Sequence, residues 1–179
     1  GNINLLGKTV DSKTDSFSYI QSKIGYVFLN PKDFLTNKTI KQEILYGLKY
    51  YNFKDSDKRF LYYSNLVGLE EKHFNQRSLE VSLAIQKKAM LASVLAIEPE
   101  ILILNYIDHG LNIKEQKALK SLLKEIKKTK MVIIVSNNSN FFLDIIDRIV
   151  IFNNKKIVTD GNKEVFYTNK ISKYIDVPN

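Results

Sequence analysis

The stretch Ile101–Asn112, ILILNYIDHGLN, decides the fold, because a short run of apolar residues ends abruptly in polar ones. Such a run, preceded by the breaker pair Glu98-Pro99, is typical of a strand that is buried on both faces. Ser82 stands at an N-cap position before a long apolar segment that reaches Ala96, which predicts a helix leading into this strand. A helix that returns directly to a buried strand indicates a parallel α/β sheet.

The same alternation continues on both sides of this stretch. Downstream, a helix over about Ile113–Lys128 leads into the apolar strand MVIIVS, and upstream IGYVF, Ile24–Phe28, is a strand stopped by Asn30-Pro31. Helical spacing after Thr39 and a second helix from about Ser56 to Val67 predict a helical insert between two strand-rich parts. The remaining expectations are a hairpin at 1–10, a helix near Phe141–Ile146, strands at 148–152 and 155–161, and a helical tail at 163–175.

Composition excludes several classes of protein. The 179 residues contain no cysteine, which excludes a disulfide framework and a thiolate metal site. No apolar run approaches the ~20 residues that cross a bilayer, so we expect a soluble, cytoplasmic chain. The chain begins at Gly1 rather than Met, without a signal or transit peptide, which suggests a trimmed chain with something missing upstream.

The net charge of +8 raises the question of nucleic acid or an anionic membrane surface as a partner. The lysines are scattered among Asn, Ile, Tyr and Phe along the whole length, which favours solvated faces over a dedicated basic patch. DNA is therefore not expected as a partner, and RNA is less favoured than a protein.

Seven segments follow one another in the order and at the spacing of a known family: IGYVFLNPKDF, TIKQEILYGLKYYNF, VGLEE, VSLAIQKKAMLASVLAIEPEILIL, IIVSN, DRIVIF and KKIVTDGNKEVF. Over nearly its whole length the chain resembles the ATP-binding subunit of ABC transporters, and most closely the energy-coupling-factor (cobalt and vitamin uptake) branch. The resemblance implies an α/β fold: a RecA-like parallel-sheet P-loop NTPase core with an antiparallel β arm and an inserted helical subdomain, the N-terminal part missing.

On this resemblance, residues 1–179 form a single ABC-type nucleotide-binding domain. Its expected parts are a remnant of the β arm (1–23), the strand and Q-loop region (24–35), the helical subdomain (36–80), the RecA-like core (81–160) and a C-terminal helical tail (161–179). The family's Walker A loop, G-x-x-x-x-G-K-[ST], is not among them, because GNINLLGKT has one residue too many between its glycines. ATP and Mg²⁺ are therefore expected only if a Walker A loop lies upstream of Gly1.

The family's catalytic positions hold residues that cannot do the chemistry. Leu29 replaces the Gln that reaches the metal, and Asn105 replaces the Asp that coordinates Mg²⁺. Tyr106 replaces the catalytic Glu, and a phenol with a pKa near ~10 is a poor general base at neutral pH. Asn137 replaces the switch His and cannot carry a charge. We expect no intact catalytic group and no intact metal site, whereas His109 is expected to be an exposed bystander.

The family's signature LSGGQ binds the nucleotide of the opposite subunit through two bare glycines. The aligned residues here are Val81, Ser82, Leu83, Ala84 and Ile85. Side chains on Leu83 and Ala84 should obstruct the close approach that glycine permits, while Ser82 is equally well explained as an ordinary N-cap. The D-loop Asp of the family becomes Asn112.

The surface that meets the membrane subunit in this family is better retained than the nucleotide site. The corresponding residues are Asn30, Pro31, Asp33, Phe34 and Tyr46. The resemblance therefore implies two partners, a second ABC ATPase subunit in a homo- or heterodimer and an integral-membrane transporter subunit, with the chain peripheral on the inner face of the membrane.

Three functions remain open from the sequence. The favoured one is a degenerate, non-hydrolytic ATP-binding-cassette subunit of an energy-coupling-factor-like uptake transporter, acting through assembly or weak nucleotide binding. One alternative is a non-transport interaction module, RNA- or ribosome-associated, on an ABC fold. The other is an ATP-hydrolysing subunit in which Asp108, two residues beyond Tyr106, replaces the lost carboxylate.

Overall fold

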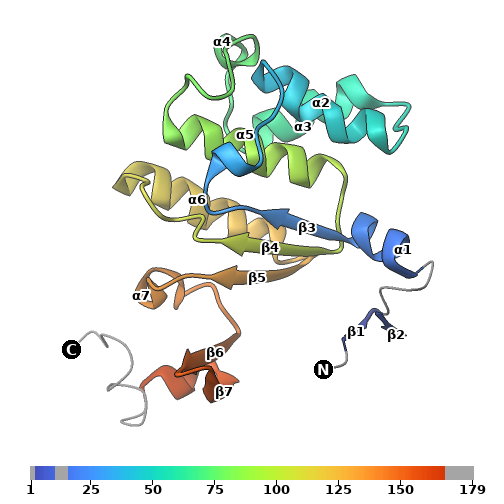
Figure 1. Cartoon of the computed structure of the whole chain (residues 1–179). Helices are drawn as coiled ribbons and strands as arrows, with labels where there is room; N and C mark the ends of the chain where they lie inside the picture. Colours follow the sequence, from blue (N-terminus) through green and yellow to red (C-terminus); the bar gives the residue numbers. More distant parts are fainter. Residues whose placement is uncertain (1–2, 11–15, 168–179) are drawn as a thin grey trace. The chain divides into compact units, whose positions relative to one another are not determined.

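The structure, a computed structural model, describes residues 3–10 and 16–167. It divides into two compact units, Gly1–Val135 and Ser136–Asn179, and each is described by itself (Figure 1).

The first unit is built on a parallel sheet of three strands, β3 (Ile24–Val27), β4 (Ile101–Asn105) and β5 (Met131–Val135). Their order is β3-β4-β5, so the apolar stretch that opened the sequence analysis is the central strand. Leu102 and Leu104 of β4 are completely buried. The predicted parallel α/β sheet is therefore confirmed.

The helices of the first unit are mostly those that the sequence predicts. They are α1 (Ser16–Lys23), α2 (Ile40–Tyr50), α3 (Ser56–Leu66), α4 (Glu71–Phe74), α5 (Leu83–Ala96) and α6 (Ile113–Ile126), with a 3₁₀ turn η1 (Pro31–Asp33) after β3. Helices α1 and α4 were not expected. The predicted hairpin is confirmed as β1 (Asn4–Leu5) paired with β2 (Lys8–Thr9).

Helix α5 holds the first unit together. It contacts β3 on one side and α2 and α3 on the other, so it lies between the sheet and the helical insert (Figure 1). Ala89, Met90, Ala92 and Ala96 are completely buried. A helix that is apolar all round is typical of such a doubly covered position, which explains why this segment shows no single apolar stripe.

The contact between α5 and the sheet is close because Gly25 has no side chain. A methyl group built on Gly25 would lie 2.4 Å from Cγ1 of Val94 and 2.8 Å from Cγ of Pro99. Gly25 is buried in the middle of β3. The close packing of β3 against α5 therefore requires a glycine at position 25.

One face of the sheet is partly exposed, and β3 and β5 are both edge strands among the described residues. Met131, Ile133 and Val135, which alternate along β5, are 60%, 39% and 45% exposed. Among the described strands, none pairs with the second edge of β5. Parallel sheets are usually covered on both faces, so this is the part of the unit that departs most from a closed α/β layer.

The second unit contains a short helix α7 (Ser139–Phe142), the antiparallel strands β6 (Arg148–Asn153) and β7 (Lys156–Asn162), and a 3₁₀ turn η2 (Lys163–Tyr167). The two strands are confirmed, but α7 ends at Phe142, so the predicted helix to Ile146 is wrong in its second half. Residues 168–175 of the expected tail lie outside the described part of the chain, and η2 is 3₁₀ rather than α-helical.

None of the helices in the described ranges is both long enough and apolar enough to cross a membrane.

The tight packing at Gly25 gives a stability prediction. Gly25→Ala forces β3 away from α5 and should lower the free energy of unfolding by about 2 kcal/mol. Gly47→Ala is the matched control. Gly47 lies within α2, and a methyl group there would lie 3.4 Å from Cγ2 of Ile97, which is an ordinary contact distance. This control should be neutral or raise the free energy of unfolding by about 0.5–1 kcal/mol. Urea denaturation followed by circular dichroism measures both, and equal effects would contradict the packing argument.

Candidate functional site

The catalytic candidates lie where β4 ends. Asn105 is the last residue of β4, and its Nδ2 donates a hydrogen bond to the hydroxyl of Tyr26 on β3, at 3.0 Å. The next residue, Tyr106, has φ +50, and its backbone N–H donates to the carbonyl of Val135 at 2.8 Å. An amide and two phenols therefore occupy this end of the sheet. These groups include no carboxylate, either as a ligand for Mg²⁺ or as a general base for water.

Carboxylates do not gather at this place. Within the described ranges, no group of three His, Asp or Glu residues is arranged to hold a metal ion. Asp108, the proposed replacement for the lost carboxylate, is only 5% exposed, and its charge acts on the ammonium of Lys87. His109 is exposed and its carbonyl accepts a hydrogen bond from Lys87. The position of Asp108 favours balancing a buried cation over activating water.

Lys87 is a residue of this site that the sequence analysis missed. It lies on α5, is 3% exposed, and its Nζ donates to the carbonyls of Tyr106, Ile107 and His109 at 2.9, 3.1 and 2.6 Å. Burial lowers the pKa of Lys87 to about 8, and the carboxylate of Asp108 opposes this shift. Little in the sequence signals this role, because Lys87 stands between Gln86 and Lys88 and the local pattern does not show which of these polar side chains is buried.

The signature position forms the N-terminus of α5. Ser82 is the N-cap, and its Oγ accepts from the N–H of Ile85 at 3.4 Å. Leu83 is 39% exposed and leans against the loop after β4, since a methyl group built on Gly110 would lie 2.6 Å from its Cδ2. Ala84 is 8% exposed. Leu83 is therefore the more exposed of the two side chains, and the obstruction of an approaching group by Leu83 and Ala84 stays a prediction.

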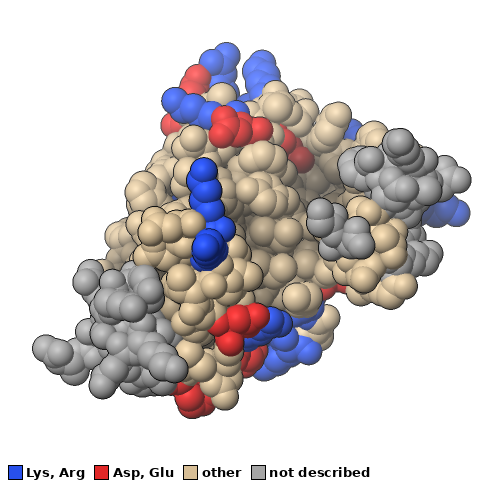
Figure 2. Space-filling model, turned by 60° about the horizontal axis from the view of Figure 1, so that its bottom comes forward, with Lys and Arg blue, Asp and Glu red and all other residues tan. Residues whose placement is uncertain are grey.

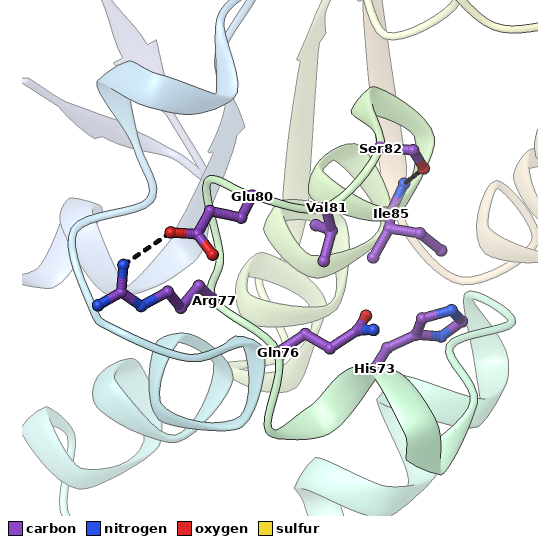
Figure 3. A pocket seen from close by; sticks show the side chains of 7 residues that line it. All are labelled: His73, Gln76, Arg77, Glu80, Val81, Ser82 and Ile85. Carbon is purple, nitrogen blue, oxygen red and sulfur yellow. Dashed lines mark hydrogen bonds and ion pairs between the residues drawn. The ribbon is translucent and has the colours of Figure 1, made fainter.

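A hollow of about 480 Å³ opens beside this helix terminus (Figure 3). Its lining residues are His73, Gln76, Arg77, Glu80, Val81, Ser82 and Ile85. The guanidinium of Arg77 is paired with Glu80 at 2.7 Å, as the dashed line in Figure 3 marks. Because this cation is already neutralised and Val81 and Ile85 form an apolar side, the hollow is poorly suited to a phosphate.

Asn112, the D-loop position, caps α6. Its side chain accepts from the N–H of Glu115 at 3.0 Å, and the Glu115 carboxylate accepts from the N–H of Asn112 at 2.8 Å. This reciprocal capping box satisfies two backbone donors of the first turn. The side chain of Asn112 is thus committed to helix α6.

The docking candidates follow β3 in a well-ordered turn. Pro31 begins η1 and is buried, whereas Asn30 and Asp33 are exposed and Phe34 is half-buried. Turn η1 contacts α5. Leu29, at the position of the metal-reaching Gln, is 39% exposed. Tyr46 projects from a separate element, α2, and is 59% exposed.

Aromatic rings pack at this turn, and one buried carboxylate binds the backbone that follows it. Phe28 packs edge-on against Tyr26, with ring centroids 4.8 Å apart, and lies 6.0 Å from Phe34. Glu43 of α2 is 5% exposed, and its Oε2 accepts from the N–H groups of Thr36 and Asn37 at 2.9 and 2.7 Å. Sequence reasoning missed Glu43, because it reads as an ordinary first-turn acid of a helix.

Asn137, at the position of the switch His, belongs to the second unit and is exposed.

Charged side chains do not form a continuous basic surface on the face drawn in Figure 2. Lys and Arg groups lie apart from one another there, several beside Asp or Glu, with uncharged side chains between them. Elsewhere in the described chain basic residues are paired with acids, as in Lys23–Glu100, Arg77–Glu80 and Lys128–Glu125. The described residues drawn there do not gather into a basic stripe of the kind that binds nucleic acid.

Relatives of this chain are ATP-binding proteins. The chain is 29% identical over 174 residues to an ABC transporter ATP-binding protein of Gloeobacter violaceus, covering 96% of this chain and 70% of that protein. It is 30% identical over 172 residues to the energy-coupling factor transporter ATP-binding protein EcfA2 of Clostridium perfringens, covering 93% of this chain and 60% of EcfA2. The chain is a relative of ABC-transporter ATP-binding proteins. It spans about 60% of the length of several curated EcfA2 proteins that it matches. No family model matches it.

Two solved structures of ABC ATPases have the same fold as this chain. The ATP-binding cassette MJ0796, in a dimeric post-hydrolysis state bound to ADP and phosphate, matches with a TM-score of 0.81 at 20% identity, covering 91% of this chain and 73% of the other. The structure of cbiO1 from Clostridium perfringens matches with a TM-score of 0.79 at 22% identity, covering 95% and 69%. The expected RecA-like ABC fold is confirmed.

The Glu43 contacts give a stability prediction for the segment that follows η1. Glu43→Ala removes the acceptor of two backbone N–H groups and should lower the free energy of unfolding by about 2 kcal/mol. Hydrogen exchange at Thr36 and Asn37 should accelerate with it. Glu43→Gln keeps one oxygen at the same place and serves as the control, with a smaller loss on both measures. Unchanged exchange at Thr36 and Asn37 in Glu43→Ala would contradict this role.

Proposed function

We propose that this chain is a subunit of an energy-coupling-factor-like uptake transporter which contributes assembly and docking and does not hydrolyse ATP at its own catalytic position. The observation that carries the proposal is a contrast within one unit. The turn at Asn30–Phe34 contains η1 and an aromatic contact of Phe34, and Glu43 binds the backbone just after it, whereas the end of β4 presents Asn105 and Tyr106.

Similarity supports the transporter part of this proposal. EcfA2 is named as the ATP-binding protein of an energy-coupling factor transporter, and cbiO1 is described as part of the ABC transporter complex cbiONQ. By analogy, the partners of this chain are a second ABC ATPase subunit and an integral-membrane subunit, and the chain lies peripherally on the inner face of the membrane. The membrane subunit contacts the turn at Asn30–Phe34 and the exposed Tyr46 of α2.

The chemistry at β4 supports the non-hydrolytic part. A positioned general base typically accelerates a reaction by about 10²–10⁴-fold, and Tyr106 carries no carboxylate to act as one. The amide of Asn105 is already bonded to Tyr26 and carries no charge to hold Mg²⁺. ATP and Mg²⁺ enter the proposal only through a G-x-x-x-x-G-K-[ST] loop, which residues 1–179 do not contain.

Capture of partners from the native host tests the proposal. The tagged chain, solubilised in mild detergent, should bring down an integral-membrane transporter subunit that mass spectrometry identifies. Asp33→Lys combined with Phe34→Ala should abolish this capture, because both side chains belong to the docking turn. Tyr50→Ala is the control, since Tyr50 is 70% exposed on α2 and is not part of that turn. If the unaltered chain recovers no membrane subunit, the proposed function is wrong.

A further inference from the structure

A charged side chain of the first unit is almost completely buried. Lys87 is on α5, whose neighbouring residues Gln86 and Ala89 are also buried, and only 3% of Lys87 is exposed. Its Nζ lies 2.9 Å from the carbonyl oxygen of Tyr106, 3.1 Å from that of Ile107 and 2.6 Å from that of His109. An ammonium group has three N–H donors, and here each of them has a carbonyl acceptor.

Such an arrangement persists only where the surroundings replace the lost hydration. Burying an ammonium without partners is strongly unfavourable, and three carbonyl oxygens together with the nearby charge of Asp108 supply the replacement. The three carbonyl oxygens also need these hydrogen bonds, because a buried acceptor without a donor destabilises a fold. Several backbone carbonyls converge on one cation, as they do in a site for a monovalent metal ion. Here the cation is the ammonium group of Lys87, which is covalently attached to the chain.

The loop that supplies these carbonyls needs such a restraint. Tyr106 has φ +50 and Gly110 has φ +75, so the chain turns sharply at both ends of the loop. A non-glycine residue with a left-handed backbone is strained and persists where contacts fix it. The carbonyl of Tyr106 is one of the three that Lys87 binds.

We propose that Lys87 is the positioning residue of the loop Tyr106–Gly110, its ammonium serving as a tethered cation in a cage of backbone carbonyls that joins the loop to helix α5. The N-terminus of α5, with Ser82 and Leu83, and the loop after β4 then form one rigid body. In the ABC relatives of this chain, the corresponding segments are the signature and the catalytic loop. This inference goes beyond the proposed function and does not depend on any partner.

A second lysine on α5 offers a comparison. The Nζ of Lys88 donates to the carbonyl of Gly68, after α3, at 2.8 Å, but this contact is exposed and involves one acceptor. Lys88 is adjacent to Lys87 and has the same side chain, so it is a matched control for charge and for helix propensity.

Chemical rescue tests the proposal. Lys87→Ala removes the three outer methylene groups and the ammonium, which together correspond to the n-propylammonium ion. Amides 107–111 should exchange at least about tenfold faster in this variant than in the unaltered chain. Adding n-propylammonium should restore slow exchange, whereas tetramethylammonium at the same concentration should not, because it carries the charge without an N–H donor.

A second variant distinguishes the effect of the ammonium group from that of the methylene groups of Lys87. It also provides a test if Lys87→Ala does not fold. Lys87→Met retains most of the apolar stem and removes the donors, so it should show the same local acceleration at 107–111. Lys88→Met should leave those amides unchanged. The proposal is wrong if Lys87→Met exchanges as slowly as the unaltered chain, or if tetramethylammonium rescues Lys87→Ala as well as n-propylammonium does.

Discussion

The burial of α5 between the sheet and the helical insert is the constraint on which the rest of the first unit depends. Gly25 permits β3 to approach Val94 closely, and the completely buried alanines of α5 leave room for neighbours on every side. The same helix presents Ser82 and Leu83 at its N-terminus and Lys87 to the loop after β4. Helix α5 thus connects the loop after β4 with the sheet and the helical insert.

The contrast between packing and chemistry is sharpest at the end of β4. Asn105 and Tyr26 satisfy each other by a hydrogen bond, and Asn112 is committed to capping α6. Both amide side chains are therefore occupied by contacts within the fold.

Sequence reasoning predicted the central strand, the long helices and the parallel sheet because apolar runs, N-caps and breakers are local signals. It missed α4, which is a single turn, and it extended α7 beyond Phe142. It also missed Glu43 and Lys87, since the partners of each are backbone groups in another segment of the chain and leave no mark on the local pattern. The burial of Ala84 likewise depends on how α5 packs against the rest of the unit.

The central claim is that the catalytic position of this chain no longer performs hydrolysis. Phosphate release by the transporter complex purified from the native host, measured with the unaltered chain and with Tyr106→Ala, tests it most directly. The account predicts equal rates within a factor of about two, because Tyr106 has no carboxylate to act as the general base. A loss of tenfold or more in an intact Tyr106→Ala complex would contradict the account and assign the phenol a part in the chemistry.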